Sequence, residues 1–122
     1  MAEIERLAPL DGALVVAFDY AAAFAALDTV SATATSVGEL GAGIDTARQE
    51  ATMNWEGVYR HEFERAQWLL DRQFFAVVDT LHSARRAIFA AIDDANEQQR
   101  AYNFAHEQTS TNTQTGATIA VA

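Results

Sequence analysis

The chain has 122 residues, of which half are apolar, and it carries a formal net charge of −9 at pH 7 with no cysteine. This length allows one small domain, and the negative charge disfavours nucleic acid and anionic membranes as partners. The absence of cysteine excludes disulfides and thiolate metal sites, and no apolar run approaches the roughly 20 residues that a membrane helix needs.

Residues 1–18 are interpreted as an N-terminal extension that precedes the first helix. The first residues are acidic and lack an apolar core, so we expect no cleavable signal peptide. The stretch from Pro9 to Gly12 predicts a turn. Asp19 is the favoured N-cap of the helix that follows, and Asp11 is the alternative cap of a longer helix.

Apolar residues recur every three or four positions from about Asp19 to about Met53, and this spacing predicts a first long helix. Many of them are small, so a second helix could approach closely. Glycines at positions 38, 41 and 43 each weaken a helix interior relative to alanine. We interpret them as a weak spot or as close packing against a bulky side chain, and a functional hinge is the alternative. The predicted stripe consists of Ala23, Leu27, Val30, Ala34, Val37, Ile44, Ala47 and Ala51.

Residues 54–57, with the sequence Asn-Trp-Glu-Gly, separate the two helical segments. Asn54 is a favoured turn residue, and Gly57 breaks the helical pattern. A short turn between two long helices predicts an antiparallel helical hairpin. Trp55 places a large apolar ring in this turn, and two interpretations of it stay open: a lid that closes the end of the hairpin, or part of a docking surface.

A heptad-like apolar stripe predicts a second helix from about Val58 to about Tyr102. The stripe consists of Tyr59, Phe63, Ala66, Leu70, Phe74, Val77, Leu81, Ala84, Ile88, Ala91 and Ala95. A further apolar set lies off this stripe, so the helix needs cover on two sides, and two hairpins packed as a four-helix bundle would supply it. We therefore predict a homodimer or heterodimer whose interface includes this second set: Trp68, Phe75, Val78, Phe89 and Ile92.

The apolar pattern stops at about Asn103, and residues 105–122 are interpreted as a flexible polar tail rich in Gln, Thr, Ser and Asn. The predicted organisation is an extension over residues 1–18, a helical hairpin over residues 19–104 and the tail. The predicted fold class is all-α.

No residue pattern indicates an enzyme. The histidines His61, His82 and His106 are spread along one predicted helix and its end, and His61 lacks the second histidine of a zinc-binding helix pair. The adjacent Asp93 and Asp94 point to different faces of a helix, which is more typical of a solvated surface than of an acid–base pair. We expect no catalytic residue, metal site, cofactor or small-molecule substrate.

Two long helices around a Trp-X-Gly turn in a short acidic chain resemble the WXG family, the small ESAT-like proteins of type VII (ESX) secretion. The resemblance covers roughly residues 13–107, and Trp55 and Gly57 occupy the motif positions. It implies a helical hairpin that forms a homodimer, or a heterodimer with a related hairpin. It also implies synthesis in the cytoplasm and export of the folded protein by a membrane-embedded ATPase, without a cleavable signal peptide.

The family often carries an export signal after the second helix, a tyrosine followed four residues later by an acidic residue. Here Tyr102 is followed four residues later by His106, and Glu107 comes one residue beyond. The resemblance therefore implies either a shifted signal formed by Tyr102 and Glu107 or a signal supplied by the partner chain. The alternative role of Tyr102 is packing against Val15 or Phe18 of the extension.

A function of another class stays open: a cytosolic helical chaperone, or an immunity-type partner of a larger secreted toxin. Neighbouring genes for a WXG-like protein and an ESX ATPase would favour the secretion hypothesis. A helical-bundle enzyme or metal carrier is disfavoured by the spacing of the histidines and carboxylates.

Overall fold

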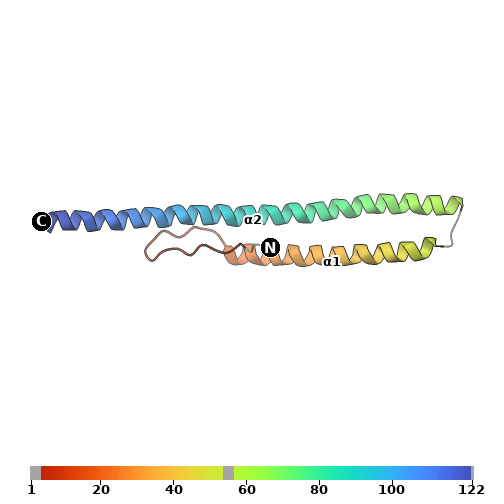
Figure 1. The fold of residues 1–122 in the computed structure, drawn as a ribbon, viewed down its shortest axis with the longest axis horizontal. Helices are drawn as coiled ribbons and strands as arrows, with labels where there is room; N and C mark the ends of the chain where they lie inside the picture. Colours follow the sequence, from red (N-terminus) through yellow and green to blue (C-terminus); the bar gives the residue numbers. More distant parts are fainter. Residues whose placement is uncertain (1–3, 54–56, 122) are drawn as a thin grey trace. The chain divides into compact units, whose positions relative to one another are not determined.

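The computed structural model describes residues 4–53 and 57–121, with side chains as far as Thr111. It contains α1 (Tyr20–Thr52, 33 residues) and α2 (Val58–Val121, 64 residues), which Figure 1 shows in chain order. The described residues contain no strand, and the two helices contact each other through their side chains. The predicted all-α class and the packing of two helices as a hairpin are therefore confirmed.

Asp19 caps the N-terminus of α1, as predicted. Its Oδ1 accepts a hydrogen bond of 3.0 Å from the N–H of Ala22, which satisfies one of the amide groups that the first helical turn leaves without a partner. The alternative cap, Asp11, lies instead in a turn that is closed by a 3.0 Å bond from the N–H of Ala13 to the carbonyl of Leu10. The helix consequently begins at Tyr20.

α2 continues to Val121, so the boundary predicted between helix and tail at residues 102–105 is wrong. The prediction equated the end of the apolar stripe with the end of the helix. No proline interrupts this stretch, and each residue added to a helix that has already formed gains a further backbone hydrogen bond. Within it, the hydroxyl of Thr109 donates to the carbonyl of Ala105 at 3.0 Å.

The chain forms two compact units. Residues 25–87 make up the first, which we call the hairpin unit; it holds most of α1 and the first half of α2. The residues up to Phe24 and from Ile88 onward make up the second, which we call the strap unit. It holds the N-terminal segment of residues 4–19, called the strap below, together with the first turn of α1 and the rest of α2.

The two helices run antiparallel within the hairpin unit. Gly41 of α1 lies against the ring of Phe74 of α2, whereas Arg48, later on α1, contacts Gln67, earlier on α2. A Cβ built on Gly41 would lie 2.5 Å from Cζ of Phe74, so the absence of a side chain lets this ring enter the seam between the helices. This contact confirms, for Gly41, the interpretation of close packing against a bulky side chain.

The seam of the hairpin unit is more polar than predicted. It follows the predicted stripe of α1 as far as Ile44, after which Arg48 is half-buried and Ala47 is exposed. α2 shows the same shift of one residue, because Gln67 and Asp71 turn toward α1 and bind Arg48. The members of the predicted α2 stripe that are exposed as a result are Tyr59, Ala66, Leu70 and Val77.

The strap unit contains the buried apolar cluster of the described residues. Its members come from the strap, from the start of α1 and from α2: Val16, Tyr20, Ile92 and Ala95. Ile92 is fully buried in this cluster, so the prediction that it belongs to a dimer interface is wrong, because the chain's own strap covers it. The ring of Tyr20 meets Phe18 edge to face, with 4.9 Å between the ring centroids.

Candidate functional site

A lateral hollow of about 620 Å³ opens between α1 and α2 in the hairpin unit. Its lining is mainly apolar and partly exposed, since Leu40 is 61% exposed and Phe75 is 64% exposed. Gly38 and Gly41 also line the hollow and contribute no side chain that would fill it. The apolar residues around it are Leu40, Ile44, Leu70, Phe74, Phe75 and Val77. An exposed apolar surface of this kind is typical of protein–protein contact.

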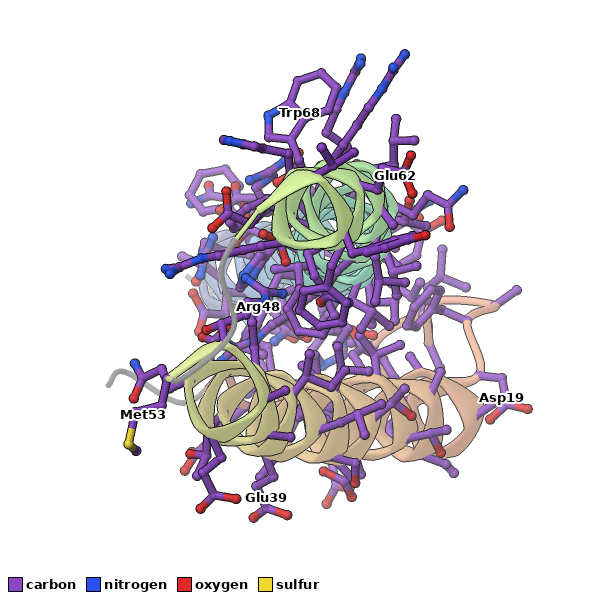
Figure 2. All side chains as sticks on the ribbon, turned by 90° about the vertical axis from the view of Figure 1, so that its right-hand side faces the viewer. Asp19, Glu39, Arg48, Met53, Glu62 and Trp68 are labelled. Atoms are coloured by element: carbon purple, nitrogen blue, oxygen red, sulfur yellow. The ribbon has the colours of Figure 1, made fainter. Side chains whose placement is uncertain are left out.

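Trp68 adds to the exposed apolar surface of the hairpin unit. Figure 2 shows it on the side of α2 that faces away from α1, whereas Arg48 points between the two helices. The indole is 57% exposed, and the guanidinium of Arg72 lies 5.0 Å from its ring centroid, a cation–π distance. Trp68 and Phe75 are seven residues apart, about two turns of α2, so they lie near each other along the helix.

The residues predicted for the dimer interface differ in what they offer a partner. Trp68 and Phe75 are exposed, so they present most of their surface to solvent. Val78 and Phe89 are half-buried within the chain, and Ile92 is fully buried. The apolar surface that a partner can reach is therefore centred on the first two of these residues, together with the lateral hollow.

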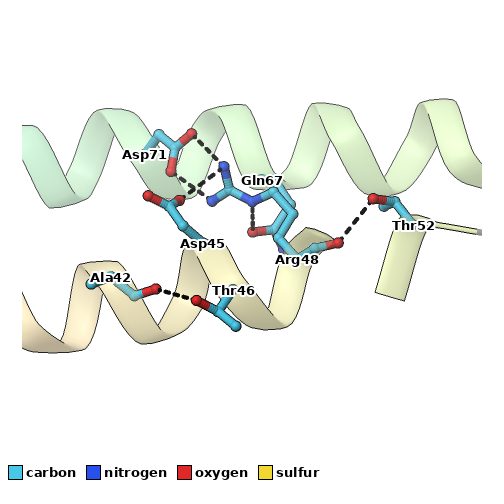
Figure 3. A network of polar contacts seen from close by, with 7 residues as sticks. All are labelled: Ala42, Asp45, Thr46, Arg48, Thr52, Gln67 and Asp71. Carbon is cyan, nitrogen blue, oxygen red and sulfur yellow. Dashed lines mark hydrogen bonds and ion pairs between the residues drawn. The ribbon is translucent and has the colours of Figure 1, made fainter. Parts of the chain in front are cut away.

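Arg48 joins the two helices of the hairpin unit through a network of polar contacts (Figure 3). Its Nη1 and Nη2 donate to both carboxylate oxygens of Asp71, at 3.1 and 2.8 Å, and its Nε donates to Oε1 of Gln67 at 3.0 Å. Asp45, on α1, lies 3.6 Å from the same guanidinium. The hydrogen bond with Asp71 raises the pKa of Arg48, and partial burial lowers it by less, so the guanidinium stays charged. This two-pronged contact fixes how α1 and α2 align.

The turn motif is described only at its last residue. Trp55 lies outside the described residues, so the lid and the docking surface both stay predictions. Gly57 has a φ of +97°, in the left-handed region that glycine favours, and its carbonyl accepts the N–H of His61 at 3.3 Å as α2 begins. A Cβ at Gly57 would meet nothing within 4 Å, so the preference for glycine comes from the backbone conformation.

Tyr102 and Glu107, the residues of the candidate export signal, both lie on α2 in the strap unit. Tyr102 is half-buried and packs against the apolar cluster that contains Val16, and its hydroxyl accepts a 2.8 Å bond from Nε2 of Gln98. Glu107 is exposed. Five positions along a helix correspond to a rotation of roughly 140°, so the helix does not bring these two side chains together on one face.

A row of amide side chains on α2 was not predicted from the sequence: Asn96, Gln99 and Asn103. Asn96 is only 8% exposed and Gln99 only 1%, and they continue the buried face that begins at Ile92. All three bind the main chain of the strap. Ile92 and the three amides follow one another at steps of three and four residues, which is the spacing of one helix face, but a search for apolar residues alone passes over amides.

Among residues 4–53 and 57–121, no group of three or more potential ligands is placed to hold a metal ion. His61 and His82 are exposed, and His106 is half-buried beside Gly12. No helix in these ranges has a stretch that is both long and apolar enough to cross a lipid bilayer. Comparison of the chain with protein-family models, with curated proteins and with solved structures gives no match.

Proposed function

We propose that this chain is a WXG-type protein of a type VII (ESX) secretion system, either a secreted substrate or a secretion partner, that acts by protein–protein contact. The observation that carries the proposal is the pair of packed helices, α1 and α2, with Trp55 and Gly57 in the short connection between them. Two long helices on either side of a Trp-X-Gly connection match the pattern of that family. The positive φ of Gly57 adds a physical reason for glycine at the last motif position.

Its partner in this proposal is a second helical hairpin, either another copy of this chain or a related WXG-like chain. The lateral hollow supports this choice, because a partner helix can insert side chains between Leu40 and Phe75. Burying large apolar side chains of this kind stabilises a complex by ~1.5–3 kcal/mol each before the costs of association. The resulting four-helix bundle would cover the exposed flank of each hairpin.

The proposed export signal is Tyr102 with Glu107, and a signal on the partner chain is the alternative. The exposed side chain of Phe104 lies between them in sequence and adds apolar surface to this part of α2. Because Tyr102 is half-buried, a receptor would contact the exposed edge of its ring. The phenol and the carboxylate lie on different faces of α2, so this proposal requires a receptor that reaches around the helix.

Export by the secretion ATPase tests the proposal. The chain is expressed in a host with a type VII system, and its amounts in the culture supernatant and in the cells are compared with those in a strain whose ATPase is inactive. We expect the chain in the supernatant only when the ATPase works. Tyr102→Ala and Glu107→Ala variants should accumulate in cells while still folded, whereas Gln108→Ala, at a neighbouring exposed position, should be exported normally. Equal release from both strains would contradict the proposal.

A cytosolic chaperone or immunity-type partner of a larger secreted toxin is the second candidate. The lateral hollow also favours it, since an exposed apolar hollow suits a helix or apolar segment of a client protein. Retention of the folded chain in the cells of both strains, together with its purification as a stoichiometric complex with a toxin, would favour this second function over the first.

A further inference from the structure

The strap lies along α2 in the strap unit (Figure 1). Its main chain forms most of the polar contacts with α2. Oδ1 of Asn96 accepts a hydrogen bond of 2.9 Å from the N–H of Leu7, and its Nδ2 donates to the carbonyl of Glu5 at 2.7 Å. One amide side chain therefore binds the carbonyl of one strap residue and the N–H of the residue two positions later. The residue between them, Arg6, contributes neither group.

The same pattern occurs three times along α2. Each amide oxygen accepts from a strap N–H, and each amide nitrogen donates to the strap carbonyl two residues earlier. The second pair is the N–H of Val16 and the carbonyl of Leu14, on Gln99, at 3.0 and 2.9 Å. The third pair is the N–H of Leu10 and the carbonyl of Ala8, on Asn103, at 3.0 and 3.1 Å.

This pattern is how an extended chain pairs with a neighbouring strand. In an extended chain, the carbonyl of one residue and the N–H of the residue two positions later point to the same side, and a side-chain amide offers the same donor and acceptor as a peptide group. The middle residue of each pair directs its own N–H elsewhere. Pro9, which has no N–H, occupies the middle of the third pair without loss of a bond. The three amides thus bind main-chain groups of two arms of the strap, residues 5–10 and 14–16, which the turn after Leu10 joins.

The buried amides determine what can occupy this face of α2. Gln99 is 1% exposed and Asn96 is 8% exposed. The strap supplies one donor and one acceptor to each, and Asn96 also accepts from the hydroxyl of Tyr20 while Gln99 also donates to Asn103. A helix or an apolar surface laid over them would leave these groups buried without partners, which is strongly unfavourable. A second main chain that doubles back in the same way would replace the strap bond for bond.

Few side chains of the strap pack against the apolar cluster. Between residues 4 and 19 only Val16 is buried, Ile4 and Phe18 are half-buried against the cluster, and Leu14 and Val15 are 70% and 57% exposed. The strap is thus bound through its backbone and through these three apolar side chains. Another peptide that doubles back in the same way and carries apolar residues at these three positions would make the same contacts.

We propose that the face of α2 formed by Ile92, Ala95, Asn96, Gln99 and Asn103 is a binding site for a peptide segment of a partner protein that doubles back as the strap does, and that the chain's own strap occupies this site until the partner displaces it. The partner segment is non-helical, is bound through its main chain as in strand addition, and carries an apolar residue where the strap has Val16. This site is separate from the lateral hollow and does not depend on the proposed export function.

The test uses the full chain with two substitutions confined to the strap, Leu7→Pro and Val16→Pro. Each removes one N–H that α2 binds, and both lie outside the helices, so neither substitution interrupts one. The probe is a fluorescent peptide with the sequence of residues 4–18, and its binding is followed by anisotropy. We expect the peptide to bind the substituted chain at least about tenfold more tightly than the wild-type chain, in which the strap competes.

Two controls distinguish binding through main-chain hydrogen bonds from nonspecific binding of the peptide. A peptide that is N-methylated at the nitrogen of Val16 should bind at least about tenfold more weakly, because a single donor to Gln99 is lost. In the substituted chain, Gln99→Leu should weaken binding similarly, whereas Gln98→Ala, an exposed amide next to it on α2, should leave binding unchanged. Absence of saturable binding to the substituted chain, or equal binding of the methylated peptide, would overturn the proposal.

Discussion

At the residue scale, two residues of α1 determine how α1 and α2 align in the hairpin unit: a glycine, which has no side chain, and an arginine. Gly41 leaves room for the ring of Phe74, and Arg48 binds two polar residues of α2. The first contact is a matter of shape and the second of charge and hydrogen bonding, so substitutions can test them separately.

Alanine substitutions at the glycines of α1 should have opposite effects. Nothing lies within 4 Å of a Cβ at Gly38, so Gly38→Ala should stabilise the chain by roughly 0.5–1 kcal/mol through helix propensity. Gly41→Ala should instead destabilise it by about 1–3 kcal/mol, because the new methyl group overlaps the ring of Phe74. Urea unfolding at one protein concentration measures both. An equal gain in stability for both variants would show that the position of the Phe74 ring does not require glycine at position 41.

The Arg48 network should require a guanidinium and not merely a positive charge. Arg48→Lys keeps the charge but cannot donate to Asp71 and Gln67 at the same time, so it should recover less than half of the loss of melting temperature caused by Arg48→Ala. Arg60→Lys, at an exposed pair with Glu64, is the control and should change little. If Arg48→Lys melted at the same temperature as the wild type, the network would not require a guanidinium.

The direction of the pKa shift of Arg48 determines how the contact between Arg48 and Asp71 depends on pH. The pKa of Arg48 is raised in the folded chain, so the stability it contributes is complete at every pH below its unfolded pKa and is lost only in strongly alkaline solution. Between about pH 6 and pH 9, the difference in melting temperature between wild type and Arg48→Ala should therefore stay constant. A difference that falls by half across this range would contradict the account.

At the scale of secondary structure elements, the sequence predicts what depends on local pattern. The cap at Asp19 and the end of α1 near Thr52 follow from a side chain that accepts backbone N–H groups and from the break in apolar spacing. The prediction fails where polar residues continue a helix, as in α2 beyond Tyr102, because periodic apolar residues identify a buried face and not the helix itself. The role of Trp55, the first motif residue, stays a prediction.

Prediction from the sequence also fails where an irregular segment covers an apolar face of a helix. Ile92 is apolar and off the predicted stripe, which suggested a second chain, but the strap buries it. Nothing in the pattern of residues 1–18 indicates that their main chain would be bound by amides on α2. The contacts involved span more than eighty positions in sequence, so local patterns carry no information about them.

Truncation of Ile92 tests whether the strap and α2 form one packed element. Ile92→Ala should destabilise the chain by about 2–5 kcal/mol, because the side chain is fully buried against the strap. It should also speed hydrogen exchange of the N–H of Val16, which is bound to Gln99. Ala91→Gly, at the exposed neighbouring position, is the control for helix propensity and should cost about 1 kcal/mol. A similarly small cost for both would argue that a partner chain, not the strap, buries Ile92.

At the scale of the whole molecule, assembly should depend on the apolar surface of the hairpin unit. Phe75→Asp places a charge on the rim of the lateral hollow, so it should weaken dimerisation at least about tenfold. Tyr59→Asp, at a position 72% exposed and outside the hollow, should leave the dimer intact. Light scattering coupled to size-exclusion chromatography gives the mass, alone and after co-expression with a neighbouring hairpin protein. A wild-type monomer in both samples would contradict the proposed assembly.

Export of a Trp55→Ala variant tests the central claim most directly. Because the proposed role of the Trp-X-Gly connection is protein contact during secretion, the variant should keep its helicity by circular dichroism while its amount in the culture supernatant falls at least about tenfold. Tyr59→Ala, which removes an exposed aromatic ring outside the lateral hollow, is the control and should be exported normally. Normal export of folded Trp55→Ala, or unfolding of the variant before export, would contradict the claim, the first because the residue is not needed and the second because its role is to hold the fold.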